Sequence, residues 1–189
     1  MMQQLRLRYV VFRGAAEVDN YDEDSHTVEL ACDDSYAGLP DKIVSFFRFA
    51  LRHPSLADIQ YFVKLDEDMI VLGEIPPPLL SDYSGVHLIA TTGIINTRYH
   101  IGRTPGSKWN NVPYAGSVTP YFNGGRGYSL SRFAAAIVAQ GVHDDIYEDL
   151  MVAKFLLPCN IRPKLCRYFE NYYISPERLA LKAGSVKSA

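Results

Sequence analysis

The chain has 189 residues, of which 48% are hydrophobic and 21% charged, with a formal net charge of -2. This length fits one domain with a substantial core, and the weak charge argues against a protein that coats nucleic acid, which usually carries a strong basic excess. The three cysteines lack C-x-x-C spacing, which argues against a zinc site. We expect free thiols at Cys32, Cys159 and Cys166, with one disulfide between the last two as the alternative.

The first third of the chain predicts two strands, a loop and a helix. Residues 5–12 and 27–32 are rich in β-branched and apolar side chains and are predicted as strands, with an acidic loop at residues 17–25 between them. Apolar residues recur on one face of residues 39–53, which begin with a proline in the first turn, as is typical of a helix.

The next third begins with the most strand-like run of the chain. Residues 59–65 are almost continuously apolar, which favours a central strand covered on both faces. The apolar pattern resumes at residues 69–72, residues 87–92 predict a further strand, and residues 96–117 are polar and irregular.

The last third predicts two more helices in a chain without internal repeats or linkers. We expect a glycine-rich turn at residues 123–127 and helices at residues 131–140 and 144–157. Strands that alternate with helices predict an α/β fold.

We expect one domain over residues 1–189, with a core at about 5–157 and a C-terminal tail at 176–189. No run is apolar and long enough for a membrane span or a signal peptide, so we expect any targeting segment to lie outside this chain or not to exist.

Three carboxylates follow the strand predicted at residues 59–65, namely Asp66, Glu67 and Asp68. In an extended backbone, Asp66 and Asp68 point to the same side. Their hard oxygens suit Mg²⁺ or Mn²⁺, and such a metal can hold a diphosphate and neutralise the charge of a leaving group. An acidic turn on a solvated loop is the alternative interpretation.

This acidic triplet belongs to one of four segments that stand in the order of a known set of motifs. They read DDSYAGLPDKIV from residue 33, YFVKLDEDMIV from 61, KWNNVPYAGSVTPYFNGGRGYSLS from 108 and YEDLMVAKFL from 147. Together they resemble the β-1,3-galactosyltransferase family. Outside the triplet, the matched positions are Asp34, Ser35, Tyr36, Leu39, Lys42, Lys108, Trp109, Pro120, Tyr121, Gly124, Gly125, Gly127, Tyr128, Ser131, Glu148, Asp149 and Leu150.

The resemblance implies a fold, an activity and a cofactor. The fold is a single GT-A type nucleotide-sugar-binding domain, with a mixed, mostly parallel sheet flanked by helices. The activity is inverting transfer of a hexose, such as galactose, N-acetylglucosamine or glucose, from a UDP-sugar donor to a hydroxyl of a glycan or glycosylated acceptor. The cofactor is Mn²⁺ or Mg²⁺.

The resemblance also assigns roles to residues. The metal ligands are Asp66 and Asp68, and Asp149 is the catalytic base, with Glu148 as its alternate and Asp144 and Asp145 as weaker ones. The donor-binding residues are Lys64, Asp66, Glu67, Asp34, Gly124 and Gly125. The acceptor-binding residues are Trp109, Tyr121, Gly127 and Tyr128. Two acidic residues at the start of a helix also have a purely structural explanation, because the helix dipole favours negative charge there.

Two features of the family have no counterpart in this sequence. The family has a further strand before the one predicted at residues 5–12, and many enzymes of the fold use a late histidine as a metal ligand, whereas no histidine follows His143. The chain is then a minimal form, a fragment, or an enzyme whose metal is held by aspartate and water. The alternative function is a catalytically weak or inactive module that binds carbohydrate or nucleotide sugar. The family pattern implies the Golgi lumen if an anchor was lost, and otherwise a soluble cytoplasmic protein.

Overall fold

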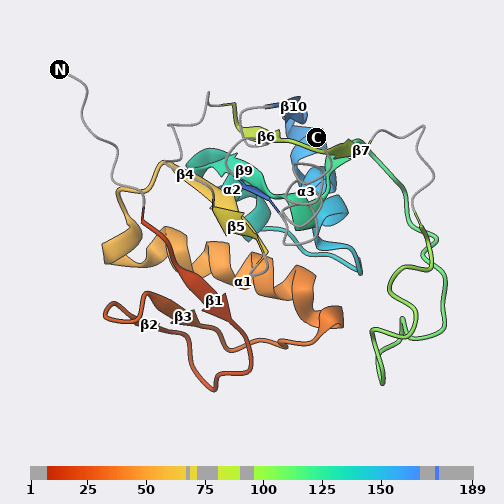
Figure 1. Ribbon diagram of the computed structural model, residues 1–189, viewed down its shortest axis with the longest axis horizontal. Coiled ribbons are helices and arrows are strands. Elements are labelled where there is room, and N and C mark those ends of the chain that lie inside the picture. The colour runs from red at the N-terminus through yellow and green to blue at the C-terminus, as the bar shows by residue number, and fades with distance from the viewer. Residues whose placement is uncertain (1–7, 67–68, 72–80, 90–95, 167–172, 175–189) are drawn as a thin grey trace, which may run out of the picture.

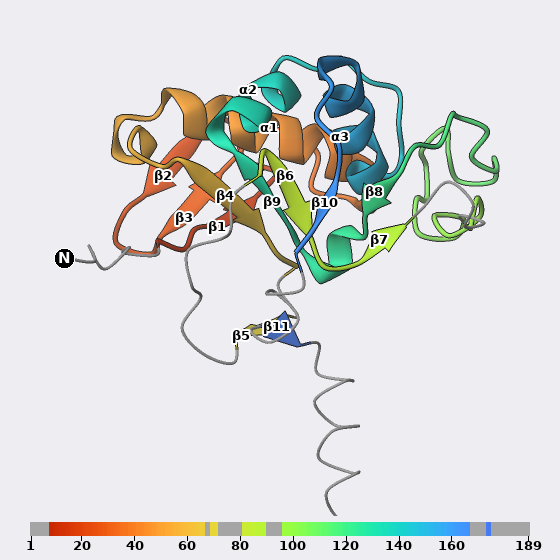
Figure 2. The same ribbon diagram turned by 90° about the horizontal axis from the view of Figure 1, so that it is seen from above.

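The computed structural model describes residues 8–66, 69–71, 81–89, 96–166 and 173–174. The described part is a mixed α/β structure, which confirms the predicted fold class. Its three α-helices are α1 (Leu39–Arg52), α2 (Arg132–Ala139) and α3 (Glu148–Leu156). They contact one another and lie together along one side of the strands (Figures 1 and 2).

A three-stranded sheet forms the N-terminal edge of the described structure, in the order β1 (Val11–Arg13), β3 (Thr27–Glu29), β2 (Asn20–Asp22). Strand β3 confirms the start of the strand predicted at 27–32, whereas β1 begins near the end of the segment predicted at 5–12. The predicted loop at 17–25 is wrong where β2 lies. Tyr21 of β2 packs edge-on against His53, with 5.4 Å between the ring centroids. Its neighbours in the sequence are polar or charged, so the apolar pattern does not reveal that this one residue faces inward.

The second sheet has four strands in the order β10 (Lys164–Leu165), β6 (Tyr83–Gly85), β9 (Tyr128–Ser131), β4 (Tyr61–Lys64). Strand β9 is antiparallel to both of its neighbours, and only β10 and β6 pair in parallel in this sheet. Strand β4 ends the sheet with half-buried residues, while β9 is fully buried. The expected central position of residues 59–65 is therefore wrong, because the antiparallel strand β9 takes that place.

Two short antiparallel pairs complete the described strands. Strand β7 (Leu88–Ile89) pairs with β8 (Tyr121–Phe122), and β5 (Ile70–Val71) pairs with β11 (Tyr173–Ile174). Strands β5 and β7 lie within the segments predicted at 69–72 and 87–92. Most of the described strand pairs are thus antiparallel, which corrects the expectation of a mostly parallel sheet.

The helices form where the apolar pattern predicts them, with boundaries set by local chemistry. Helix α1 has a proline in its first turn and ends where His53 becomes extended. Helix α2 begins after Ser131, whose side chain accepts a hydrogen bond from the Ala134 amide at 3.1 Å. Helix α3 begins four residues later than predicted, because its cap residue Tyr147 keeps an extended backbone. The polar segment at residues 96–117 is irregular, as predicted.

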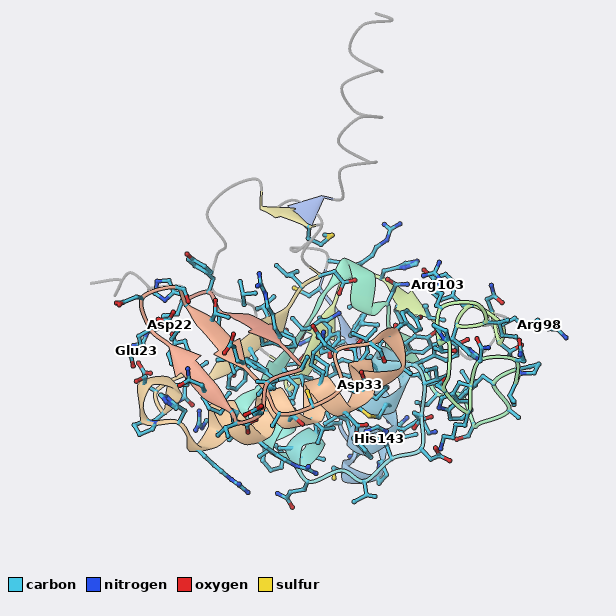
Figure 3. The ribbon with its side chains drawn as sticks, turned by 90° about the horizontal axis from the view of Figure 1, so that it is seen from below. Asp22, Glu23, Asp33, Arg98, Arg103 and His143 are labelled. Atoms are coloured by element: carbon cyan, nitrogen blue, oxygen red, sulfur yellow. The ribbon has the colours of Figure 1, made fainter. Side chains whose placement is uncertain are left out.

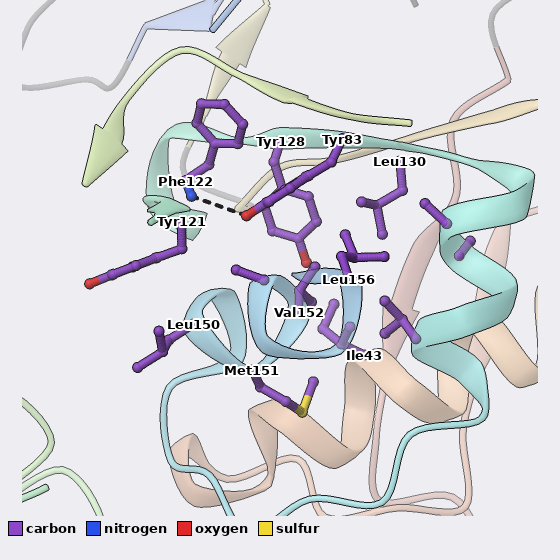
Figure 4. Packing of buried hydrophobic residues seen from close by; sticks show 14 of the residues in the cluster. Ile43, Tyr83, Tyr121, Phe122, Tyr128, Leu130, Leu150, Met151, Val152 and Leu156 are labelled. Atoms are coloured by element: carbon purple, nitrogen blue, oxygen red, sulfur yellow. Dashed lines mark hydrogen bonds between the residues drawn. The ribbon is translucent and has the colours of Figure 1, made fainter. Parts of the chain in front are cut away.

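The core lies between the second sheet and the helices (Figure 4). Tyr83, Tyr128 and Leu130 of the sheet are at most 1% exposed, and they pack with the buried apolar face of α3. The Tyr83 hydroxyl accepts a hydrogen bond from the Phe122 amide at 3.0 Å, which ties β8 to this core. The core therefore fixes the start of α3 and the turn after β8 relative to the sheet.

Two further sequence expectations concern the whole chain. None of the helices in the described ranges has both the length and the apolar character needed to cross a bilayer. The three cysteines are free, as predicted, although Cys159 is exposed and Cys32 and Cys166 are half-buried rather than in the core.

Candidate functional site

Three segments that are far apart in the sequence meet at one place. They are the end of β4, the 3-10 turn η3 (Gly124–Arg126) and the first turn of α3. The Lys64 ammonium group forms an ion pair with Asp66, lies 3.7 Å from Glu148 Oε2 and donates to the Gly124 carbonyl at 3.3 Å. Asp149 accepts a hydrogen bond from the Gly124 amide at 3.0 Å. We call these five residues the Lys64 cluster.

Lys64 holds the cluster together electrostatically. Its side chain is only 12% exposed. Burial lowers the pKa of Lys64, but the carboxylates of Glu148, Asp66 and Asp149 outweigh this effect and raise the pKa overall. The lysine is therefore charged at neutral pH, and it partly compensates the negative charge of its three neighbours.

Glu148 is a buried partner of this lysine. Its side chain is 8% exposed, and Oε1 accepts a hydrogen bond from the Tyr128 hydroxyl at 2.5 Å while Oε2 faces Lys64. Burial, followed by the charge of Glu148, raises the pKa of Tyr128 well above its usual value, so this hydroxyl remains a donor. Both oxygens of Glu148 thus have partners inside the protein.

Asp149 occupies a different environment from Glu148. Its Oδ1 accepts a hydrogen bond from the Leu150 amide at 2.8 Å, and its Oδ2 accepts the bond from Gly124. Burial and then the Glu148 carboxylate raise the pKa of Asp149 to about 7. A carboxyl group with this pKa can both accept and release a proton near neutral pH, which is the property a general base needs.

The three glycines of the turn differ in what a side chain would meet. Gly127 has a φ of +80°, a conformation that side chains rarely adopt. A Cβ atom on Gly124 would lie 2.8 Å from Glu148 Oε2, inside the cluster. A Cβ atom on Gly125 would meet only the tips of flexible side chains, at 3.3 Å from Asp66 Oδ2 and 3.4 Å from Asn123 Oδ1. Of these three glycines, only Gly127 has a positive φ.

These distances predict a contrast between two alanine substitutions in the turn. Gly124→Ala forces a methyl group against a buried carboxylate, and we expect it to lower the free energy of unfolding by about 1–3 kcal/mol. Gly125→Ala is the matched control, and we expect a change within about 0.5 kcal/mol because the neighbouring side chains can move. Urea unfolding of the two variants measures the contrast, and equal losses would contradict this description of the turn.

The predicted acceptor residues fall into two groups. Gly127 and Tyr128 are buried, and the Tyr128 hydroxyl donates a hydrogen bond to Glu148. A contact with a bound sugar therefore does not fit their positions. Tyr121 is also buried, at 7% exposed, and burial followed by the charge of Asp149 raises its pKa. Trp109 is half-buried in the segment at residues 96–117.

The predicted donor residue Asp34 lies with the start of α1. Its carboxylate pairs with Lys42 at 2.6 Å, and this hydrogen bond lowers the pKa of Asp34. A surface ion pair of this kind explains Asp34 without a ligand.

Of the two predicted metal ligands, Asp66 lies among the described residues and Asp68 lies outside them, as does the predicted donor residue Glu67. Within the described ranges, no group of three or more His, Cys, Asp and Glu residues is arranged to hold a metal ion. The Asp66 side chain is 43% exposed, and its Oδ2 atom faces Gly125 at the surface of the turn. Its carboxylate oxygens are the hard ligands that Mg²⁺ and Mn²⁺ prefer.

Sequence reasoning missed how the segment at residues 96–117 is held against α3. His100 is fully buried, with Nδ1 at 2.8 Å from the Tyr147 hydroxyl and Nε2 at 2.8 Å from the Val112 carbonyl oxygen. The Tyr147 hydroxyl also donates to the Asn96 carbonyl at 2.9 Å. Tyr147 directly precedes Glu148, so this segment borders the Lys64 cluster. The only signal in the sequence is a histidine among aromatic residues.

Comparison with protein-family models and with curated proteins finds no match. The functional interpretation therefore depends on the four sequence motifs and on the geometry of the Lys64 cluster.

Proposed function

We propose that the protein is an inverting glycosyltransferase that transfers a hexose from a UDP-sugar to a hydroxyl group of a glycan acceptor. One observation carries this proposal. Residues that the motifs assign to donor binding, Lys64, Asp66 and Gly124, contact residues that the motifs assign to proton transfer, Glu148 and Asp149. Three of the four motifs thus meet through hydrogen bonds and ion pairs, and three chance matches on solvated loops would have no reason to do so.

In this proposal, Asp149 is the general base. It takes the proton of the acceptor hydroxyl, and the hydroxyl oxygen attacks the anomeric carbon of the donor sugar. The bond from that carbon to the diphosphate breaks, and the electron pair leaves with UDP, so the configuration at the anomeric carbon is inverted. The pKa of Asp149, raised to about 7, supports this role. Glu148 is instead held by the charged Lys64 and by the Tyr128 hydroxyl.

The remaining residues of the cluster position the base and the donor. Lys64 holds Glu148 and the carbonyl of Gly124, and the amide of Gly124 holds Asp149. Asp66, with its exposed carboxylate beside the turn, would hold Mn²⁺ or Mg²⁺ together with Asp68. The metal, when bound, would neutralise the charge that develops on the diphosphate.

The GT-A type fold belongs to the same proposal. A mixed α/β structure with acidic residues directly after a strand supports it, since ligands of open α/β sheets bind at the carboxyl ends of strands.

The first test of the proposal is metal-dependent binding of UDP. We expect calorimetry to detect UDP binding with Mn²⁺ and not with EDTA. Asp66→Asn and Asp68→Asn should each weaken binding by at least about tenfold, or ~1.4 kcal/mol. Asp58→Asn is the control, because Asp58 pairs with Arg8 at 2.8 Å on the surface, away from the motifs.

Equal UDP affinity in Mn²⁺ and EDTA would remove the metal from the proposal. Metal-dependent UDP binding without hydrolysis of UDP-sugars or transfer to any acceptor would instead make the protein a nucleotide-sugar-binding module.

A further inference from the structure

One long stretch of the chain contains basic residues but no acidic ones. Residues 83–143 contain no Asp or Glu, although the chain as a whole is slightly acidic. The basic residues of this stretch are Arg98, Arg103, Lys108, Arg126 and Arg132. Lys108 pairs with Asp144 beyond the stretch, and Arg132 donates to backbone carbonyls. Any other negative partner must come from elsewhere in the chain or from a ligand.

Arg103 is the member of this group with the most specific surroundings. The carbon at the centre of its guanidinium group lies 3.9 Å from the ring centroid of Tyr99 and 5.8 Å from that of Tyr36. It is exposed, and among the described residues it has no ion pair with a carboxylate. A guanidinium group stacked on aromatic rings keeps the N–H groups at its edge free for a planar anion.

The segment that carries Tyr99 and Arg103 is held against Tyr147, which stands two positions before Asp149 at the start of α3. His100 Nδ1 lies 2.8 Å from the Tyr147 hydroxyl, and that hydroxyl donates to the Asn96 carbonyl at 2.9 Å. In Figure 3, Arg98 projects from the outer margin of the segment, whereas Arg103 lies on the side toward the rest of the molecule. Arg98 therefore serves as a control from the same segment.

We propose that Tyr36, Tyr99 and Arg103 form an acceptor subsite for a sugar that carries a carboxylate group, of the uronic acid class. The inference rests on the proposed function, because it places the acceptor on a segment that is held against Tyr147, just before Glu148 and Asp149. The guanidinium edge offers two parallel N–H groups that match the two oxygens of a carboxylate. The tyrosine hydroxyl groups can form hydrogen bonds with the hydroxyl groups of the sugar. A neutral sugar offers the guanidinium group no charged acceptor, so it should bind less tightly than an acidic one.

The test compares two acceptors that differ only in the carboxylate, 4-nitrophenyl β-glucuronide and 4-nitrophenyl β-glucoside. Their binding to the full chain is measured by calorimetry with UDP and Mn²⁺ present, and transfer is measured in parallel. We expect the wild type to favour the glucuronide by about tenfold or more, the range of one charge-assisted hydrogen bond. Arg103→Ala should abolish this preference and leave the glucoside and UDP affinities unchanged, and Arg98→Ala should keep it.

Each other outcome has a defined meaning. Equal binding of the two glycosides by the wild type, or no binding of either, overturns the acidic subsite. Weaker UDP binding in Arg103→Ala would assign the arginine to the donor diphosphate and also overturn it. Equal weakening of both glycosides would give Arg103 a structural role only. The proposed function fails separately, through absence of UDP binding and of transfer, even if the glucuronide still binds through Arg103.

Discussion

Asp149→Asn should slow single-turnover transfer by roughly 10²–10⁴-fold, the usual contribution of a general base. The substitution preserves the shape of the side chain, and the amide oxygen can still accept the hydrogen bond from the Gly124 amide, while the bond from the Leu150 amide is lost. It removes the ability to take a proton from the acceptor hydroxyl. The affinity for UDP should change little, because Asp149 is not among the proposed metal ligands.

Asp144→Asn is the matched control for this experiment. Asp144 is an exposed aspartate just before α3 that pairs with Lys108, and its loss should leave the transfer rate unchanged. Normal turnover of Asp149→Asn would exclude Asp149 as the base, and Glu148→Gln would be tested next. A loss of UDP affinity equal to the loss of rate would show that Asp149 serves the donor instead.

The pH dependence of transfer gives an independent check on the same residue. The base must be ionised to act, and the pKa of Asp149 is raised from 3.8 to about 7. The rate should therefore rise about tenfold per pH unit below pH 7 and become level above it. Asp149→Asn should lose this dependence, whereas Asp144→Asn should keep it.

The sequence predicted the elements whose pattern is carried by strongly apolar residues. Helix α1 has a buried face of Ile43, Val44 and Phe47, and its predicted and observed boundaries differ by one residue. Strand β4 lies within the run predicted at 59–65. The three segments of the Lys64 cluster are the end of β4, the turn η3 and the start of α3. Each adjoins an element that packs in the core, so the core sets their positions.

The sequence failed where burial is carried by polar or aromatic side chains. Strand β9 reads Tyr-Ser-Leu-Ser and is fully buried, because the hydroxyl groups of Tyr128 and Ser131 find partners in Glu148 and Asp82. Periodicity of apolar residues does not detect such a strand. The sequence also could not distinguish the environments of Glu148 and Asp149. They differ in which carboxylate oxygens contact Lys64, Tyr128 and the backbone amides, and this depends on the folded structure.

Lys64→Met should lower the free energy of unfolding by about 3 kcal/mol or more, because it leaves the buried Glu148 without its cation. The methionine side chain fills a similar volume, so the loss would report charge rather than packing. Lys42→Met is the control, since the pair of Lys42 with Asp34 is 16% and 40% exposed and contributes within about 1 kcal/mol. Urea unfolding at neutral pH measures both variants.

The double variant Lys64→Met, Glu148→Gln separates the ion pair from other effects of the lysine. If the buried charge of Glu148 causes the loss, neutralising it should recover part of the stability, and the two single changes should not add. Additive losses, or a Lys64→Met variant no less stable than Lys42→Met, would mean that the pair at 3.7 Å contributes nothing. Lys64 also lowers the pKa of Asp149. A Lys64→Met enzyme should therefore need a higher pH than the wild type to reach its full transfer rate, which links the stability of the cluster to the proton transfer that we propose it performs.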